Sequence, residues 1–277
     1  MKRIDIAKIL RDKNPSLAPY VPRFVVRWVE KLICARGLNE ILELYSTRDA
    51  IGFIHGALDY IGVKYELHGT ENIPPTGRVI FASNHPLGGV DGMILAAAIE
   101  PIRPGVKLIV NDILMNLEPL RPIFVGVNKF GSQGKSFAGA MDSLFESEAP
   151  IINFPAGFCS RLGANGICDL QWRKSFVSRS IASSRIVVPT FVQARNSMFF
   201  YRVARLRRML GIKANLELVL LPRQVFFQKG RTVHIFFGKP ITMDSSLSTD
   251  QWCQKIRQEA YALGDEQTTR RVTCQKK

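Results

Sequence analysis

The first part of the chain repeats apolar residues at helical spacing. Residues 21–34, 38–45 and 48–61 are predicted to form helices, with Gly62 as the stop of the third. In the first of these, Phe24 and Trp28 fall on one face and basic residues fall on the other. Such an amphipathic helix either packs on the rest of the protein or lies at a membrane interface. We expect an N-terminal helical region over residues 1–62.

After residue 62, short strand-like runs alternate with helix-like runs. The predicted strands cover residues 63–69, 79–82, 105–110, 186–194, 216–222 and 232–237. This alternation predicts an α/β fold with a mainly parallel central sheet that is flanked by helices. A last helix is predicted from residue 250 to about Leu263, and a polar, mobile tail begins at Gly264. We therefore expect an α/β domain over residues 63–249 and a C-terminal helix and tail over residues 250–277.

A polar turn inside the sequence FASNHPLGGVDGMIL is the strongest candidate for chemistry. It joins the apolar run at residues 79–82 to a helix-like run, and α/β enzymes place catalytic groups on such turns. His85 can take and return a proton near neutral pH, and the carboxylate of Asp91 would orient the ring and stabilise its charged form. Gly88 and Gly89 would give the backbone the freedom to bring these two side chains together.

A histidine followed closely by an aspartate is weak evidence by itself. His55 and Asp59 also lie four residues apart, within a predicted helix where a surface pair is the simpler interpretation. His85 differs because a proline and two glycines follow it and apolar runs flank the turn. This setting favours His85 as the catalytic candidate.

The sequence NHPLGGVDG at residues 84–92 resembles the first block of the glycerolipid acyltransferases, the lysophosphatidate-acyltransferase superfamily. In that superfamily a His and an Asp separated by four residues form the catalytic dyad. Five residues separate His85 from Asp91, which resembles a bacterial branch of lipid N-acyltransferases that make glycine lipids. The resemblance covers residues 63–241 and implies the α/β fold of the glycerol-3-phosphate acyltransferases.

The stretch PIFVGVNKFGSQGKS at residues 122–136 is the second candidate for substrate binding. A predicted strand ends in Asn128 and Lys129, and the glycine-rich sequence after them could hold an anionic headgroup or carboxylate. A solvated lysine on an ordinary loop is the alternative. The superfamily carries a phosphate-binding Arg in this block. Because Lys129 lacks the bidentate geometry of Arg, it counts against a phosphorylated acceptor.

The stretch IINFPAGFCSR at residues 151–161 resembles the third block, usually Phe-Pro-Glu-Gly followed by a small residue and Arg. The matching residues are Phe154, Pro155, Gly157 and Arg161, whereas Ala156 stands where the acidic residue would be. We assign all five to substrate binding. Backbone N–H groups around Ala156 and Gly157 are candidates to hold the developing oxyanion. Cys159 is a less favoured alternative nucleophile, because a lone buried cysteine is usually structural.

The net charge of the chain indicates an anionic partner. The 277 residues carry a formal charge of +15 and no nucleic-acid motif, which leaves an anionic membrane surface or an acidic carrier protein. In residues 196–211, a helical face with Phe199 and Leu206 lies beside four arginines, which suits a membrane-surface or carrier-docking element. The five scattered cysteines fit a reducing compartment and show no metal-ligand spacing.

The N-terminal sequence lacks the apolar core of a signal peptide, and no apolar run is long enough to span a bilayer. We expect a cytoplasmic protein that is peripheral to the inner face of the cytoplasmic membrane.

These observations predict an acyltransferase without a metal or other cofactor. The donor would be a fatty acyl thioester of acyl carrier protein or coenzyme A, and the acceptor a small amine such as glycine. His85 would act as general base with Asp91. The alternatives are O-acylation of lysophosphatidate, a non-catalytic lipid-binding protein, and a thioesterase that uses Cys159.

Overall fold

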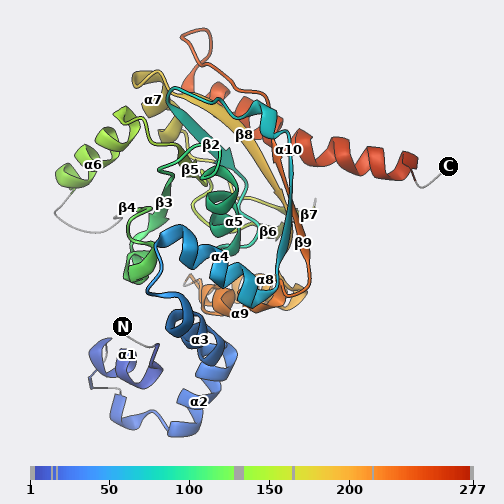
Figure 1. The fold of residues 1–277 in the computed structure, drawn as a ribbon. Coiled ribbons are helices and arrows are strands. Elements are labelled where there is room, and N and C mark those ends of the chain that lie inside the picture. The colour runs from blue at the N-terminus through green and yellow to red at the C-terminus, as the bar shows by residue number, and fades with distance from the viewer. Residues whose placement is uncertain are drawn as a thin grey trace. The chain divides into compact units, whose positions relative to one another are not determined.

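The computed structural model describes residues 4–13, 15–16, 18–127, 134–163, 166–213 and 215–274 (Figure 1). The chain forms two compact units. The first contains Met1–Val63 and Asn196–Arg231, and the second contains Lys64–Arg195 and Thr232–Lys277. The first unit is therefore assembled from two separate parts of the sequence.

A seven-stranded sheet with the order β1-β9-β8-β2-β5-β3-β4 forms the centre of the second unit. Its strands are β1 (Lys64–His68), β2 (Val79–Ser83), β3 (Lys107–Asn111), β4 (Phe124–Val127), β5 (Ile151–Asn153), β8 (Ile186–Gln193) and β9 (Thr232–Phe237). Strand β2 pairs in parallel with both β5 and β8, whereas β9 is antiparallel to β8 and parallel to β1. A separate antiparallel hairpin consists of β6 (Arg161–Gly163) and β7 (Gly166–Cys168). The predicted mainly parallel α/β fold is confirmed.

Helices cover both faces of this sheet. They are α5 (Val90–Ile99), α6 (Gly134–Glu146), α7 (Ser175–Ala182) and α10 (Thr249–Cys274), with 3-10 turns at Thr70–Asn72, Asp112–Asn116 and Glu118–Leu120. Ile80 and Ile151 share one face with a core that contains Phe145 of α6 and Trp252 of α10. Helix α5 packs on the other face, beside Leu108 of β3. Because both of its faces are covered, β2 is buried throughout and its sequence is apolar from Val79 to Ala82.

Helix α10 continues past the predicted end near Leu263, and Gly264 lies within it. A Cβ atom at Gly264 would lie 2.4 Å from Cε1 of Phe191 on β8. The glycine therefore allows the helix to pack closely against the strand. It does not end the helix.

The first unit is helical. It contains α1 (Ile6–Lys13), α2 (Arg23–Leu32), α3 (Ala35–Tyr45), α4 (Ala50–Ile61), α8 (Met198–Met209) and α9 (Leu221–Phe227), with 3-10 turns at Ala18–Tyr20 and Leu216–Leu220. The three predicted N-terminal helices are confirmed, and α4 ends at Gly62 with φ of 71°. The exposed fractions of Phe24 and Trp28 on α2 are 72% and 60%. Across the described residues, no helix combines the length and the apolar character that crossing a bilayer requires.

The predicted strand at residues 216–222 is wrong. This segment forms the 3-10 turn at Leu216–Leu220 and the start of α9. A short apolar run fits a buried helix as well as a strand. In this segment the fully buried Glu217 forms an ion pair of 2.8 Å with Arg207 of α8. The apolar pattern of residues 216–222 does not reveal this contact with α8.

Candidate active site

The structure brings His85 and Asp91 together. His85 follows the carboxyl end of β2, and Asp91 lies in the first turn of α5. Nδ1 of His85 is 3.0 Å from Oδ2 of Asp91, and the exposed fractions of the two side chains are 16% and 0%. The five intervening residues therefore leave the pair within hydrogen-bond distance.

The turn between these residues closes around the Asp91 carboxylate. Its Oδ2 also accepts a hydrogen bond of 2.9 Å from the N–H of Leu87, and its Oδ1 accepts one of 2.9 Å from the N–H of Gly92. Gly88 has φ of 89°, a region that favours glycine. Gly89 has φ of −98°, and a Cβ atom there would meet open space. The turn thus requires only the first of the two glycines that the sequence singled out.

The carboxylate of Asp91 determines which nitrogen of the His85 ring carries the proton. A carboxylate only accepts hydrogen bonds, so Nδ1 of His85 carries the proton and Nε2 is left with a lone pair. Burial alone would lower the pKa of His85, but the charge and hydrogen bond of Asp91, with a further contribution from the charge of Asp169, raise it above its ordinary value. Nε2 is therefore a stronger base than that of a free histidine.

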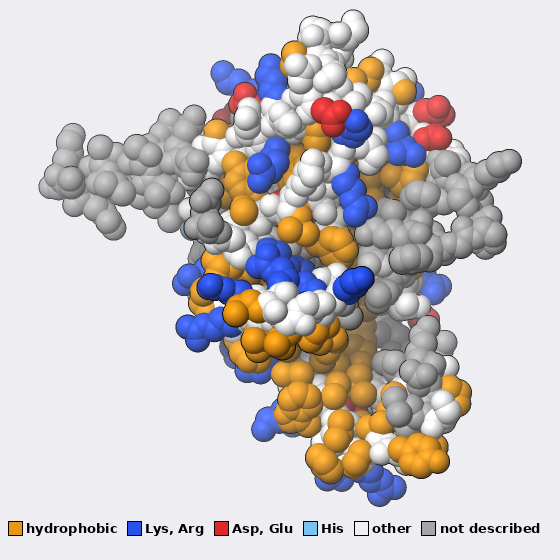
Figure 2. Space-filling view, turned by 180° about the vertical axis from the view of Figure 1, so that it is seen from behind, with side chains coloured by type: hydrophobic (Ala, Val, Ile, Leu, Met, Phe, Trp, Pro, Cys, Tyr) orange, Lys and Arg blue, Asp and Glu red, His pale blue; other side chains and the backbone are white. Residues whose placement is uncertain are grey.

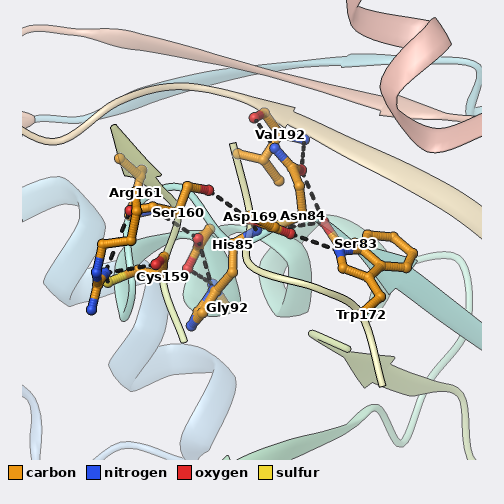
Figure 3. A network of polar contacts seen from close by, with 12 residues as sticks. Ser83, Asn84, His85, Gly92, Cys159, Ser160, Arg161, Asp169, Trp172 and Val192 are labelled. Atoms are coloured by element: carbon orange, nitrogen blue, oxygen red, sulfur yellow. Dashed lines mark hydrogen bonds and ion pairs between the residues drawn. The ribbon is translucent and has the colours of Figure 1, made fainter. Parts of the chain in front are cut away.

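A second carboxylate, Asp169, holds the backbone of His85 (Figure 3). Oδ1 of Asp169 accepts hydrogen bonds from the hydroxyl of Ser160 at 2.6 Å and from the N–H of His85 at 3.2 Å. Oδ2 accepts from Nε1 of Trp172 at 2.9 Å, and the N–H of Asp169 donates to the hydroxyl of Tyr261 at 2.8 Å. Ser160 also donates its N–H to the carbonyl of His85 at 2.8 Å. Asp169 is thus a positioning residue for His85.

Asn84 anchors the same turn to the neighbouring strand. Its side-chain amide donates to the carbonyl of Val192 at 3.0 Å and accepts from the N–H of Val192 at 2.7 Å. This pair of bonds continues the pairing of β2 with β8 just beyond the end of β2. Asn84 is the first residue of the NHPLGGVDG motif, but its structural role depends on this contact with another strand.

The predicted third block lies against the histidine. The rings of Phe154 and His85 stack with centroids 3.9 Å apart, and Pro155 and Ala156 are buried. Gly157 has φ of 67° and donates its N–H to the carbonyl of Phe154 at 2.9 Å. The Gly157 N–H is therefore engaged within the turn, and the role of backbone N–H groups around Ala156 and Gly157 in holding an oxyanion stays a prediction.

Arg161 and Cys159 form a buried contact. Nη1 of Arg161 lies 2.6 Å from the carbonyl oxygen of Cys159 and 3.0 Å from its Sγ atom. Burial raises the pKa of the Cys159 thiol more than Arg161 lowers it. The thiol therefore stays protonated at neutral pH, which disfavours a thiolate nucleophile. The other predicted substrate-binding residues, Asn128 and Lys129, lie outside the described residues.

Comparison with known proteins identifies related sequences. A family model described as Acyltransferase matches residues 8–266. A lyso-glycine lipid O-acyltransferase of Bacteroides thetaiotaomicron is 39% identical over 264 residues, which cover 94% of this chain and 97% of the relative. A protein of the same name from Phocaeicola vulgatus is 38% identical over 264 residues, with coverages of 94% and 95%.

A solved structure shows the same fold. The crystal structure of PlsC, the 1-acyl-sn-glycerophosphate acyltransferase of Thermotoga maritima, matches with a TM-score of 0.50 and 13% identity. The match covers 79% of this chain and 78% of PlsC.

We predict that Asp91→Asn lowers the pKa of His85. The substitution removes the negative charge while the burial that opposes imidazole protonation remains. NMR titration of the His85 ring would measure the change. Asp59→Asn, at an exposed position on α4, is the control and should leave the His85 titration as in the wild type. An unchanged His85 titration in Asp91→Asn would contradict the proposed coupling.

The two glycines of the turn should respond differently to substitution. Gly88→Ala places a Cβ atom in the left-handed region and should lower the free energy of unfolding by about 1–2 kcal/mol. Gly89→Ala should stay within about 0.5 kcal/mol of the wild type, because its φ is ordinary and space is open. Urea unfolding measures both. Equal effects at the two positions would show that Gly88 is not the residue that closes the turn.

Proposed function

Because the chain belongs to the acyltransferase family, we propose that it transfers a fatty acyl group from a thioester to the hydroxyl group of a lyso-glycine lipid. The observation that carries the proposal is the buried His85–Asp91 pair, which supplies a base for a hydroxyl. The names of two relatives at 39% and 38% identity support the choice of acceptor.

The proposed reaction needs one proton transfer through His85. A hydroxyl group is a poor nucleophile, and Nε2 of His85 takes its proton as the oxygen attacks the thioester carbonyl. Asp91 stabilises the imidazolium that forms. The C–S bond then breaks, the thiolate receives the proton from His85, and an ester remains. General-base assistance of this kind contributes about 10²–10⁴-fold to the rate.

Phe154 is the predicted substrate-binding residue with the clearest structural support. Its ring stacks on that of His85, so a substrate that reaches Nε2 passes beside an aromatic surface. Lys129 and Asn128 remain sequence-based proposals for the glycine carboxylate of the acceptor. The thioester of acyl carrier protein or of coenzyme A is the proposed donor, and either one delivers the same acyl carbonyl.

An amine acceptor is the competing proposal. Ala156 supports it, because its side chain cannot accept a hydrogen bond from an acceptor hydroxyl, in contrast to the acidic residue of the superfamily motif. Free glycine would use the same base but give an amide. The two proposals therefore differ in the bond that forms and can be separated by product analysis.

We further propose that the first unit contacts an anionic membrane surface. Large apolar side chains are exposed across this unit: Tyr20, Phe24, Trp28, Leu44, Met198, Phe199, Leu206, Met209, Leu210, Ile212, Leu216 and Val219. Figure 2 shows apolar side chains gathered on the surface with Lys and Arg side chains among them. Aromatic and aliphatic groups bordered by basic ones suit the headgroup region of a bilayer, where a lyso-lipid acceptor resides.

The arginines of α8 divide into two kinds. Arg202 and Arg205 are exposed and can meet lipid phosphates. Arg207 instead lies 2.8 Å from the buried Glu217, and it also donates to the carbonyl of Ile212 at 2.6 Å. Of the four arginines that the sequence suggested for a membrane surface, Arg207 instead stabilises the first unit through its contacts with Glu217 and Ile212.

Purified protein with acyl thioester should acylate lyso-glycine lipid, and mass spectrometry should detect a new ester. His85→Ala should reduce the rate by about 10²-fold or more, because the general base is lost. His55→Ala, which changes an exposed histidine on α4, is the control and should keep the wild-type rate. An amide of glycine as the main product would favour the amine proposal. Thioester hydrolysis without any acceptor product would contradict both proposals.

Vesicle binding should depend on lipid charge and on exposed apolar residues. The double variant Trp28→Ser/Met209→Ser should bind phosphatidylglycerol vesicles at least tenfold more weakly than the wild type in a flotation assay. Ile102→Ser, at an exposed position in the second unit, is the control. Vesicles of phosphatidylcholine alone should bind less, since they lack net charge. Equal binding by the double variant and the control would contradict the proposed surface.

A further inference from the structure

Three potential metal ligands meet on the sheet face near its edge. Glu66 and His68 are two residues apart on β1, so their side chains point to the same face. His234 on β9 is the direct partner of Glu66 in the parallel pairing. None of these three residues belongs to the site around His85.

Two of the three distances between the ligand atoms match those around a tetrahedral metal ion. Nε2 of His68 is 3.3 Å from Nδ1 of His234, and that Nδ1 is 3.2 Å from Oε2 of Glu66. All three ligand atoms lie within 4.8 Å of one another. Zinc with ligands at 2.0–2.1 Å requires donor atoms about 3.3 Å apart. In the part of the chain that the structure describes, this is the one cluster of three His, Cys, Asp or Glu ligands with such spacing.

Hydrogen bonding alone suits this cluster poorly. Nδ1 of His234 faces both a carboxylate oxygen and the Nε2 atom of His68. With the proton on Nδ1, two acceptors share it; with the proton on Nε2 of His68, the Glu66 oxygen faces the lone pair of Nδ1. A cation would instead accept a lone pair from each of the three atoms. The converging lone pairs therefore favour a metal ligand set over a hydrogen-bonded pair.

The surroundings hold the cluster and place a further polar side chain on the same face of the sheet. The His68 ring stacks on Phe236, with centroids 4.5 Å apart and an angle of 12° between the planes. Gln193 on β8 is the direct antiparallel partner of His234, so it shares that face of the sheet. Oε1 of Gln193 is buried and lacks a hydrogen-bond partner among the described residues. A buried oxygen of this kind calls for a polar partner, and the described residues do not supply one.

We propose that Glu66, His68 and His234 bind a zinc ion, with Gln193 or a water molecule in the fourth position. Two imidazoles and a carboxylate form a known zinc ligand set. The ion would join β1 to β9, which is the neighbour that holds this edge strand in the sheet. Its role would be to fix β1, which begins directly after Val63, the last residue of the N-terminal segment of the first unit.

Zinc titration of the metal-stripped full-length protein tests this proposal. Isothermal titration calorimetry should show one zinc ion per chain, with micromolar or tighter affinity. His68→Gln and His234→Gln should each weaken binding at least tenfold. His55→Gln and His85→Gln change the two histidines outside the cluster and should bind zinc like the wild type. Cobalt should give the strong visible absorption of tetrahedral coordination in the wild type but not in His68→Gln/His234→Gln.

Thermal unfolding separates loss of the site from loss of the fold. Zinc should raise the melting temperature of the wild type but not that of His68→Gln/His234→Gln, whose acyl transfer and circular dichroism without zinc should match the wild type. Absence of stoichiometric binding would overturn the proposal. Wild-type affinity in both His68→Gln and His234→Gln would overturn it as well, and so would loss of binding in His85→Gln alone.

Discussion

The buried carboxylate of Asp91 is the constraint on which the site depends. A charge with no exposure to solvent needs several hydrogen bonds, and Asp91 obtains them from the His85 ring and from the N–H groups of Leu87 and Gly92. These partners surround the carboxylate only if the chain turns back sharply between β2 and α5. The position of Asp91 in the first turn of α5 adds the favourable field of the helix N-terminus.

The two carboxylates near His85 act on different parts of it. Asp91 binds the imidazole ring and sets which nitrogen carries the proton, whereas Asp169 binds the backbone N–H. Burial raises the pKa of Asp169, although its hydrogen bonds with Ser160, Trp172 and His85 oppose that rise. Both charges favour a protonated His85. Orientation and basicity of the ring therefore come from one connected network (Figure 3).

Features that depend on residues close to one another in the sequence were predictable from the sequence. The buried strand β2, the turn after it and the pair His85–Asp91 lie within one short stretch, whose pattern predicted the strand, the turn and the contact between the two side chains. Asp169 could not be found this way, because it meets His85 across 84 positions in the sequence. The pairing of His68 with His234 spans 166 positions and depends on strand register. The predicted helix end at Gly264 was wrong for the same reason, since the glycine is explained by close packing against Phe191 on another element, β8.

The first unit is built from two separate segments of the chain, and this limits how the protein can be divided. Peptide bonds cross between the two units after Val63, Arg195 and Arg231, so the first unit is not a terminal attachment. Deleting residues 1–63 would leave 196–231 without the helices they pack on, and Phe226 would lose the contact that it makes at Gly37. The N-terminal helices and the segment between β8 and β9 therefore pack as one body, so a shortened form of this protein has to keep or remove both segments together.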